Sequence, residues 1–157
     1  TGLRIGLGFA KGIALAYNAQ LVGINTLDIV AEAAGKMENH LIAVCEAGRS
    51  RVCAATYYFY SRKAWQLKQA ADIYKWEDLV AQVPVGSVFA GEISADARSI
   101  IRNANRSLKL ASPAQGARRA AHLAELAIQR LHKGNADDAA ALVPVYLRDP
   151  AGKKING

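Results

Sequence analysis

The chain has 157 residues, enough for one full domain or for one domain with part of another. Its residues are 52% hydrophobic and 21% charged, which excludes an intrinsically disordered chain. Twenty basic residues against 13 acidic ones give a net charge of +7, which favours acidic partners such as nucleic acid without identifying one. Two cysteines are too few for a disulfide scaffold, and the first residues lack the order of a signal peptide. We therefore expect a cytoplasmic protein with reduced thiols.

A helix is predicted over residues 1–18, with Thr1 as its N-cap and Asn18 as its C-terminal stop. Apolar residues spaced by three and four positions define one face of this helix: Leu3, Leu7, Ala10, Ala14 and Tyr17. The basic side chains of Arg4 and Lys11 argue against a membrane span.

Four glycines interrupt the same helix, at positions 2, 6, 8 and 12. Each interior glycine costs about 0.5–1 kcal/mol relative to alanine, so the missing side chains are expected to permit a close approach. Gly8 and Gly12 lie four residues apart and therefore share a face. Two interpretations stay open: tight packing on the protein's own sheet, or docking of a second chain.

The next elements are a short strand over 21–24 and a helix over 26–34, capped by Thr26 and ended by Gly35. A polar junction over 36–39 is the expected domain boundary. Beyond it the pattern predicts a strand over 40–47, a turn over 48–51 and a return strand over 52–60, hence a hairpin. A third antiparallel strand is expected over 65–69.

The second half of the chain alternates helices and strands. We predict helices over 76–83, 94–105 and 115–133, with strands over 87–90 and 108–111 between them. Ser94 caps the second of these helices and Gly134 ends the third. Three antiparallel strands followed by alternating helices and strands resemble a ribonuclease-H-like unit, the building block of the actin/Hsp70/sugar-kinase (ASKHA) fold. The expected fold class is therefore α/β.

Both ends of the chain carry a family resemblance. The opening Thr-Gly-Leu-Arg-Ile-Gly, with Ala10-Lys11-Gly12 behind it, resembles the signature helix of the TsaB/YeaZ family, whose members are often described as glycoprotease-like or peptidase M22-like. The run Pro144-Val145-Tyr146-Leu147-Arg148 resembles the ending of the same family. This resemblance implies two ASKHA-like units and a missing N-terminal third. Residues 1–38 are then a remnant of the first unit, 39–143 the complete second unit, and 144–157 a C-terminal tail.

The resemblance also implies a function. TsaB/YeaZ proteins are non-catalytic scaffolds in the synthesis of tRNA threonylcarbamoyladenosine (t6A). They bind and stabilise the transferase TsaD, which holds the metal, and the ATPase TsaE joins the assembly. No cofactor is implied for this chain, its tRNA contact is expected to be indirect, and alone it is expected to form a homodimer through the opening helix. The expected partner-binding residues lie on that helix: Arg4, Gly8, Lys11, Gly12 and Ala16.

Catalytic alternatives find little support in the residues. The three histidines form neither HExxH nor HxxxH, so no metal ligand and no catalytic residue are predicted, although an M22-type metallopeptidase or hydrolase remains an alternative. Cys45 and Cys53 lie in apolar strands and are expected to be buried and inert. The turn at Gly91 has one glycine and the acidic Glu92, which disfavours phosphate binding. The turn over 46–51, whose sequence differs from that of the TsaB/YeaZ family, is expected to be a solvated hairpin tip.

One basic pattern supports a different class of function. Arg98, Arg102 and Arg106 recur every four residues and predict a stripe along one side of a helix. Such a stripe is either a solvated face or a phosphate-contacting surface. A basic RNA-binding module is therefore a further alternative.

Overall fold

The structure is a computed structural model that describes residues 2–48, 50–60 and 64–148. It divides into two compact units: Thr1–Ile24 with Ala124–Gly157, and Asn25–Leu123. The expected capping role of Thr1 lies outside the described residues, and the domain boundaries expected from the sequence stay a prediction. The elements in chain order are α1 (Gly2–Ala16), α2 (Thr26–Ala34), β1 (Leu41–Glu46), β2 (Arg51–Tyr60), β3 (Ala64–Lys75), α3 (Trp76–Gln82), β4 (Val88–Gly91), α4 (Ala95–Ala104), β5 (Lys109–Leu110), the 3₁₀ helix η1 (Pro113–Gly116) and α5 (Ala120–His132).

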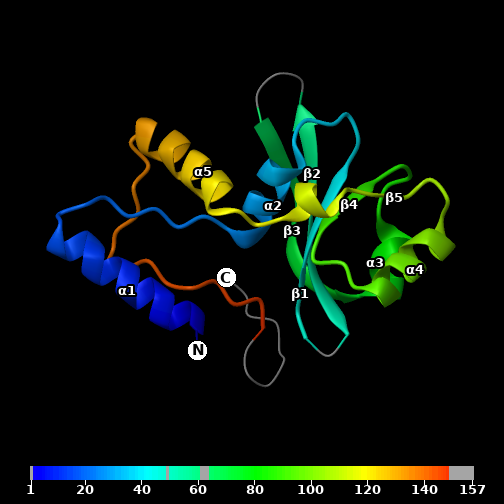
Figure 1. Ribbon diagram of the computed structural model, residues 1–157, viewed down its shortest axis with the longest axis horizontal. Coiled ribbons are helices and arrows are strands. Elements are labelled where there is room, and N and C mark those ends of the chain that lie inside the picture. The colour runs from blue at the N-terminus through cyan, green and yellow to red at the C-terminus, as the bar shows by residue number, and fades with distance from the viewer. Residues whose placement is uncertain (1, 49, 61–63, 149–157) are drawn as a thin grey trace. The chain divides into compact units, whose positions relative to one another are not determined.

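The unit Asn25–Leu123 is built on a five-stranded sheet with the order β3-β2-β1-β4-β5 (Figure 1). Strands β1, β2 and β3 pair antiparallel, whereas β4 pairs parallel with β1 and β5 parallel with β4. A three-stranded meander extended by two parallel strands with helical connections is the arrangement of a ribonuclease-H-like unit. The predicted α/β fold class is confirmed.

Helices cover both faces of this sheet. Figure 1 shows α2 on one side, with α3 and α4 on the other. Leu27 and Val30 of α2 pack with Leu41 of β1, and Ile101 of α4 packs with Phe89 of β4. Each fully buried side chain of this size stabilises the fold by about 1.5–3 kcal/mol. Side chains alternate between the two sheet faces in the first half of β2, because Val52 and Ala54 join one cluster while Ala55 and Tyr57 join the other.

Three local predictions in the first half of the chain need correction. The segment 21–24 is not a strand, because Leu21 makes only an isolated bridge, with Asp137. The N-cap of α2 is Asn25 rather than Thr26, and it makes no side-chain capping hydrogen bond. The third strand runs over Ala64–Lys75, well beyond the predicted 65–69, since β2 offers it a long partner.

The predicted long helix over 115–133 is wrong in its first third. Ser112 and Gln115 form a reciprocal capping box that starts η1, and α5 begins only at Ala120. Gly116 ends η1 with its backbone close to Gly91, where an added Cβ would lie 2.5 Å from the Gly91 nitrogen. The chain therefore leaves helical geometry to pack against the end of β4, which periodicity could not reveal.

Candidate functional site

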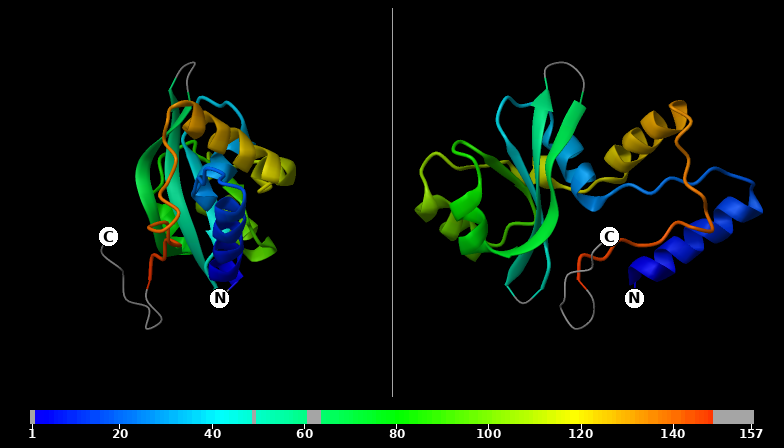
Figure 2. Two further views of the ribbon diagram at one scale, coloured as in Figure 1. Left: turned by 90° about the vertical axis from the view of Figure 1, so that its left-hand side faces the viewer. Right: turned by 180° about the vertical axis from the view of Figure 1, so that it is seen from behind.

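The helix α1 belongs to the unit formed by the two ends of the chain, and the C-terminal segment runs beside it (Figures 1 and 2). Lys11 Nζ donates a hydrogen bond to the Ala140 carbonyl at 3.3 Å, and the Arg4 guanidinium lies 5.3 Å from the centroid of the Tyr146 ring. Ala14 is the buried residue of the helix. These contacts define the face of α1 that its own unit covers.

An uncovered apolar face lies on the other side of α1. Ile5, Phe9 and Ile13, spaced by four residues, are 68%, 72% and 45% exposed, and we call them the α1 apolar stripe. Leu3 and Tyr17, expected on the packed face, are also largely exposed. Exposed apolar surface is typical of interaction sites.

The glycines of α1 are not required by packing inside the described part of the chain. A Cβ added at Gly2, Gly6, Gly8 or Gly12 would meet no heavy atom within 4 Å. At 100° per residue, Ala16 lies within the α1 apolar stripe, Gly12 borders it, and Gly8 lies one step further round. Arg4 and Lys11 instead face the C-terminal segment. The structure thus separates the five predicted partner-binding residues into two groups, and their role stays a prediction.

A polar network holds the chain that follows α1. Arg130 of α5 donates to the Gly23 carbonyl at 2.6 Å and to Asp137 Oδ1 at 3.0 Å. The Gly23 N–H donates to Asp137 Oδ2 at 2.7 Å. The Gly23 hydrogen bond, followed by the Arg130 contact, lowers the pKa of Asp137. These bonds connect residues distant in the sequence and so fix the segment from which α1 extends.

The three arginines of the predicted basic stripe do not share one helix side. Arg98 is half-buried, and its Nε donates to the Ile93 carbonyl at 3.2 Å. Arg102 is exposed on α4, whereas Arg106 follows the end of that helix at Ala104. The prediction that all three arginines lie along one side of a helix is therefore wrong, because α4 ends at Ala104, before Arg106. A nucleic-acid contact by these residues stays a prediction.

The hairpin turn after β1 contacts the turn after β4. The Glu46 N–H donates to Glu92 Oε2 at 2.9 Å, and the other carboxylate oxygen of Glu92 pairs with Arg118. A hollow of about 240 Å³ lies here. The Glu92 carboxylate accepts the hydrogen bond of the Glu46 N–H and also lines the hollow. The negative charge of Glu92 would repel an anionic phosphate there.

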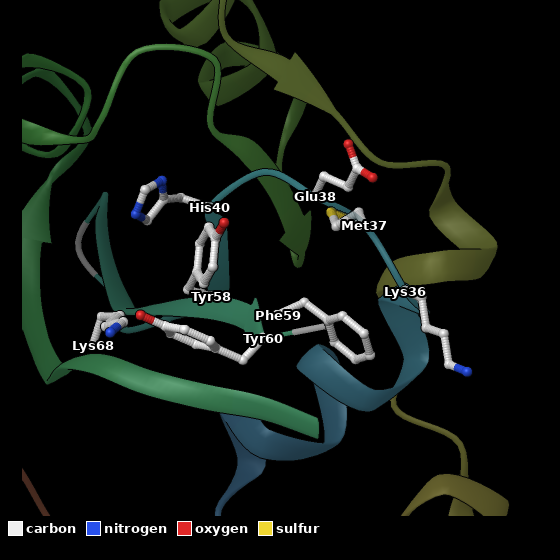
Figure 3. A pocket seen from close by; sticks show the side chains of 8 residues that line it. All are labelled: Lys36, Met37, Glu38, His40, Tyr58, Phe59, Tyr60 and Lys68. Carbon is white, nitrogen blue, oxygen red and sulfur yellow. The ribbon is translucent and has the colours of Figure 1, made fainter. Parts of the chain in front are cut away.

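A hollow of about 1020 Å³ opens beside the start of β1 and the end of β2 (Figure 3). Figure 3 shows His40, Tyr58 and Tyr60 gathered on one side, with Phe59 turned to the other. The rings of His40 and Tyr58 lie 5.1 Å apart, and those of Tyr58 and Tyr60 lie 5.2 Å apart. Lys68 Nζ is 4.9 Å from the Tyr60 ring centroid. Sequence reasoning did not single out this hollow, although the alternating tyrosines of β2 were a signal for it.

The two cysteines are not separate buried thiols. Cys45 of β1 and Cys53 of β2 are paired directly opposite each other, and both are half-buried rather than buried. The expectation that both thiols are buried is therefore wrong. The signal that could have revealed the pair is their equal spacing on either side of the hairpin turn.

The described residues contain neither a candidate membrane-spanning helix nor a candidate metal-binding cluster. No helix within 2–48, 50–60 and 64–148 is long and apolar enough to cross a membrane. In the same described ranges, no group of three or more His, Cys, Asp or Glu residues could hold a metal ion.

Comparison with known proteins identifies the family. Residues 1–155 match the model of the family described as TsaD, tRNA N6-adenosine threonylcarbamoyltransferase. The chain belongs to the TsaD family. A comparison with curated proteins gives no match.

Solved structures related to this TsaD-family chain carry the name YeaZ. One is described as an uncharacterized protein with similarity to peptidase YeaZ from Pseudomonas aeruginosa, with 22% identity and a TM-score of 0.70 over 94% of this chain and 68% of that one. Another, YeaZ from Pseudomonas aeruginosa, is 19% identical with a TM-score of 0.67 over 92% of this chain and 68% of that one. At these identities the likeness concerns the fold. The resemblance to TsaB/YeaZ drawn from the two ends of the sequence is confirmed.

Proposed function

We propose that this chain is a non-catalytic scaffold subunit in t6A synthesis, and that α1 binds a TsaD-like transferase. Membership of the TsaD family supports the t6A context. The observation that carries the binding role is the α1 apolar stripe, which the described residues of its own unit leave exposed.

The size of the stripe decides what kind of contact it can make. Complete burial of three side chains contributes about 1.5–3 kcal/mol each, whereas association costs about 4–15 kcal/mol. Ile5, Phe9 and Ile13 alone therefore do not give a stable complex. The open glycine positions of α1 would let a partner helix approach closely and bury more surface than the stripe alone. In this proposal Gly8, Gly12 and Ala16 supply the close approach, while Arg4 and Lys11 act indirectly, through their contacts with the C-terminal segment.

The remaining partners follow from the same role. A TsaE-like ATPase joins the complex, and tRNA is contacted mainly through the transferase, with Arg102 and Arg106 as the exposed basic side chains available to it. Without a transferase, the same α1 surface pairs with a second copy of the chain. The complex is cytoplasmic in this proposal.

The decisive experiment places a charge in the centre of the α1 apolar stripe. We expect Phe9→Asp to weaken binding to a TsaD-like transferase at least about 30-fold, because a central aromatic anchor typically contributes 2 kcal/mol or more. The same substitution should convert the free chain from dimer to monomer. Isothermal titration calorimetry measures the first effect, and light scattering across a concentration series measures the second.

Val85→Asp is the matched control, because Val85 is 79% exposed but lies outside α1. It should leave both affinity and oligomeric state unchanged. An affinity unaffected by Phe9→Asp would contradict the proposed surface. Transferase activity of the purified chain alone, or metal-dependent peptidase activity, would contradict the non-catalytic role.

A further inference from the structure

The cysteine pair lies in the antiparallel ladder between β1 and β2. Cys45 and Cys53 occupy opposite positions in the register, so their side chains leave the same face of the sheet, which is the face covered by α2. Both thiols pack at the margin of that apolar cluster and are half-buried. The two residues are therefore only partly covered, whereas a fully buried pair would be protected.

Hydrogen bonding in the hairpin fixes the spacing of this pair. The Ala47 N–H donates to the Arg51 carbonyl at 3.0 Å, which makes these two residues a hydrogen-bonded pair. Hydrogen-bonded and non-hydrogen-bonded pairs alternate along an antiparallel ladder, so Cys45 and Cys53 form the next hydrogen-bonded pair. Opposite Cα atoms at such positions lie about 5.5 Å apart, near the middle of the range that a disulfide spans, about 4.4–6.8 Å.

The two thiols also differ in acidity. The hydrogen bond from Cys53 is the largest influence that lowers the pKa of Cys45, to about 7, with a smaller contribution from Arg118 against burial and Glu92. The same hydrogen bond, then burial and the charge of Cys45, raise the pKa of Cys53. Cys45 is thus the more acidic thiol and Cys53 the less acidic one, which suits an attacking thiol beside a resolving thiol.

We propose that Cys45 and Cys53 form a dithiol site that a small-molecule disulfide oxidises to an intrachain disulfide. This site is separate from α1, and the proposal does not rest on the role of that helix.

The reaction balances with one molecule of disulfide oxidant, for which oxidised glutathione is the probe. The Cys45 thiolate attacks one sulfur of oxidised glutathione, which forms a mixed disulfide and releases one glutathione thiolate. Cys53 then loses its proton to solvent, and its sulfur attacks the sulfur of Cys45 and expels the second glutathione. The chain gives up two electrons and two protons, and these appear in the two reduced glutathione molecules.

The test uses the whole chain, fully reduced and then incubated with oxidised glutathione near neutral pH. We expect both free thiols to disappear in a titration with Ellman's reagent and the intact mass to fall by two hydrogen atoms. Trypsin cleaves after Arg49 and Arg51 in the hairpin turn, so a non-reducing digest should contain two peptides joined through Cys45 and Cys53. Dithiothreitol should separate them.

Two single variants test the roles of the thiols. Cys53→Ala removes the donor to Cys45, whereas Cys53→Ser keeps a hydroxyl donor in nearly the same place. At neutral pH, alkylation of Cys45 by iodoacetamide should slow about threefold in Cys53→Ala relative to the wild-type chain, because the smaller thiolate fraction is partly offset by greater nucleophilicity. Cys53→Ser should retain most of the rate.

Three results would overturn the proposal: two thiols that persist in the oxidant, stable glutathione adducts on both cysteines, or a disulfide that joins two chains. None of these results depends on transferase binding. A failure of the dithiol site is therefore distinguishable from a failure of the scaffold role.

Discussion

Tyr57 shows how one polar side chain connects two elements of the larger unit. Its hydroxyl donates a hydrogen bond to Asp28 Oδ1 at 2.7 Å and so joins β2 to α2. Burial, followed by the Asp28 hydrogen bond, raises the pKa of Tyr57, so the phenol stays protonated as the donor. The partly buried carboxylate of Asp28 depends on this donor.

We expect Tyr57→Phe to lower the free energy of unfolding by about 1–2 kcal/mol, because the Asp28 carboxylate would lose a donor it cannot replace fully from water. Urea denaturation at neutral pH measures the change. Tyr60→Phe is the control, since Tyr60 is half exposed, and it should shift stability by less than about 0.5 kcal/mol. Equal effects of the two substitutions would show that the Asp28 contact contributes nothing.

At the scale of the elements, the end of β4 is a point of very close packing. Gly91 has φ 122°, and a Cβ there would overlap the Val44 carbonyl oxygen of β1. The backbone of Gly116 in η1 approaches Gly91 from another direction. The glycine at the end of β4 is therefore explained by the meeting of β1, β4 and η1.

This packing predicts an unequal response to two glycine substitutions. Gly91→Ala should destabilise the chain by about 2–4 kcal/mol, since backbone strain and a clash with Val44 add together. Gly86→Ala also places a side chain at positive φ, 78°, but in open space, so it should cost only about 1 kcal/mol. Thermal and urea unfolding of both variants test the difference, and similar losses would refute the packing explanation.

On the scale of the whole molecule, the two compact units differ in their cores. Within the described residues, the buried hydrophobic side chains belong to the unit Asn25–Leu123, with Ala14 of α1 as the exception. The unit formed by the chain ends relies on the Arg130–Asp137–Gly23 network and on contacts to α1. Its helix α1 also contains four glycines, each of which disfavours helix by about 0.5–1 kcal/mol.

Hydrogen exchange should reveal this difference directly. We expect amides of α1 to exchange by local opening, orders of magnitude faster than those of β1 and β2, which should open only with global unfolding. Addition of a TsaD-like transferase should slow exchange in α1 and leave β1 unchanged. Uniform protection across both units of the free chain would contradict this expectation.

The sequence alone determined the five strands of the larger unit, its helices α2, α3 and α4, and their order, but not η1. Alternation over 40–60 with a turn between predicted the β1–β2 hairpin, and Ser94 marked the start of α4 through its side-chain bond to the Ala97 N–H. These features depend on contacts between near neighbours, so local patterns contain them. Motifs at the two ends of the chain likewise pointed to the family before any fold was known.

Only the tertiary structure decided which surfaces are free and which side chains meet. The helix α1 is apolar on more than one face, so periodicity alone could not show that Ile5, Phe9 and Ile13 are exposed. The break before α5 depends on Gly116 meeting Gly91, and the dithiol pair depends on the exact register of β1 and β2. Each of these outcomes is fixed by contacts between residues that local sequence patterns treat independently.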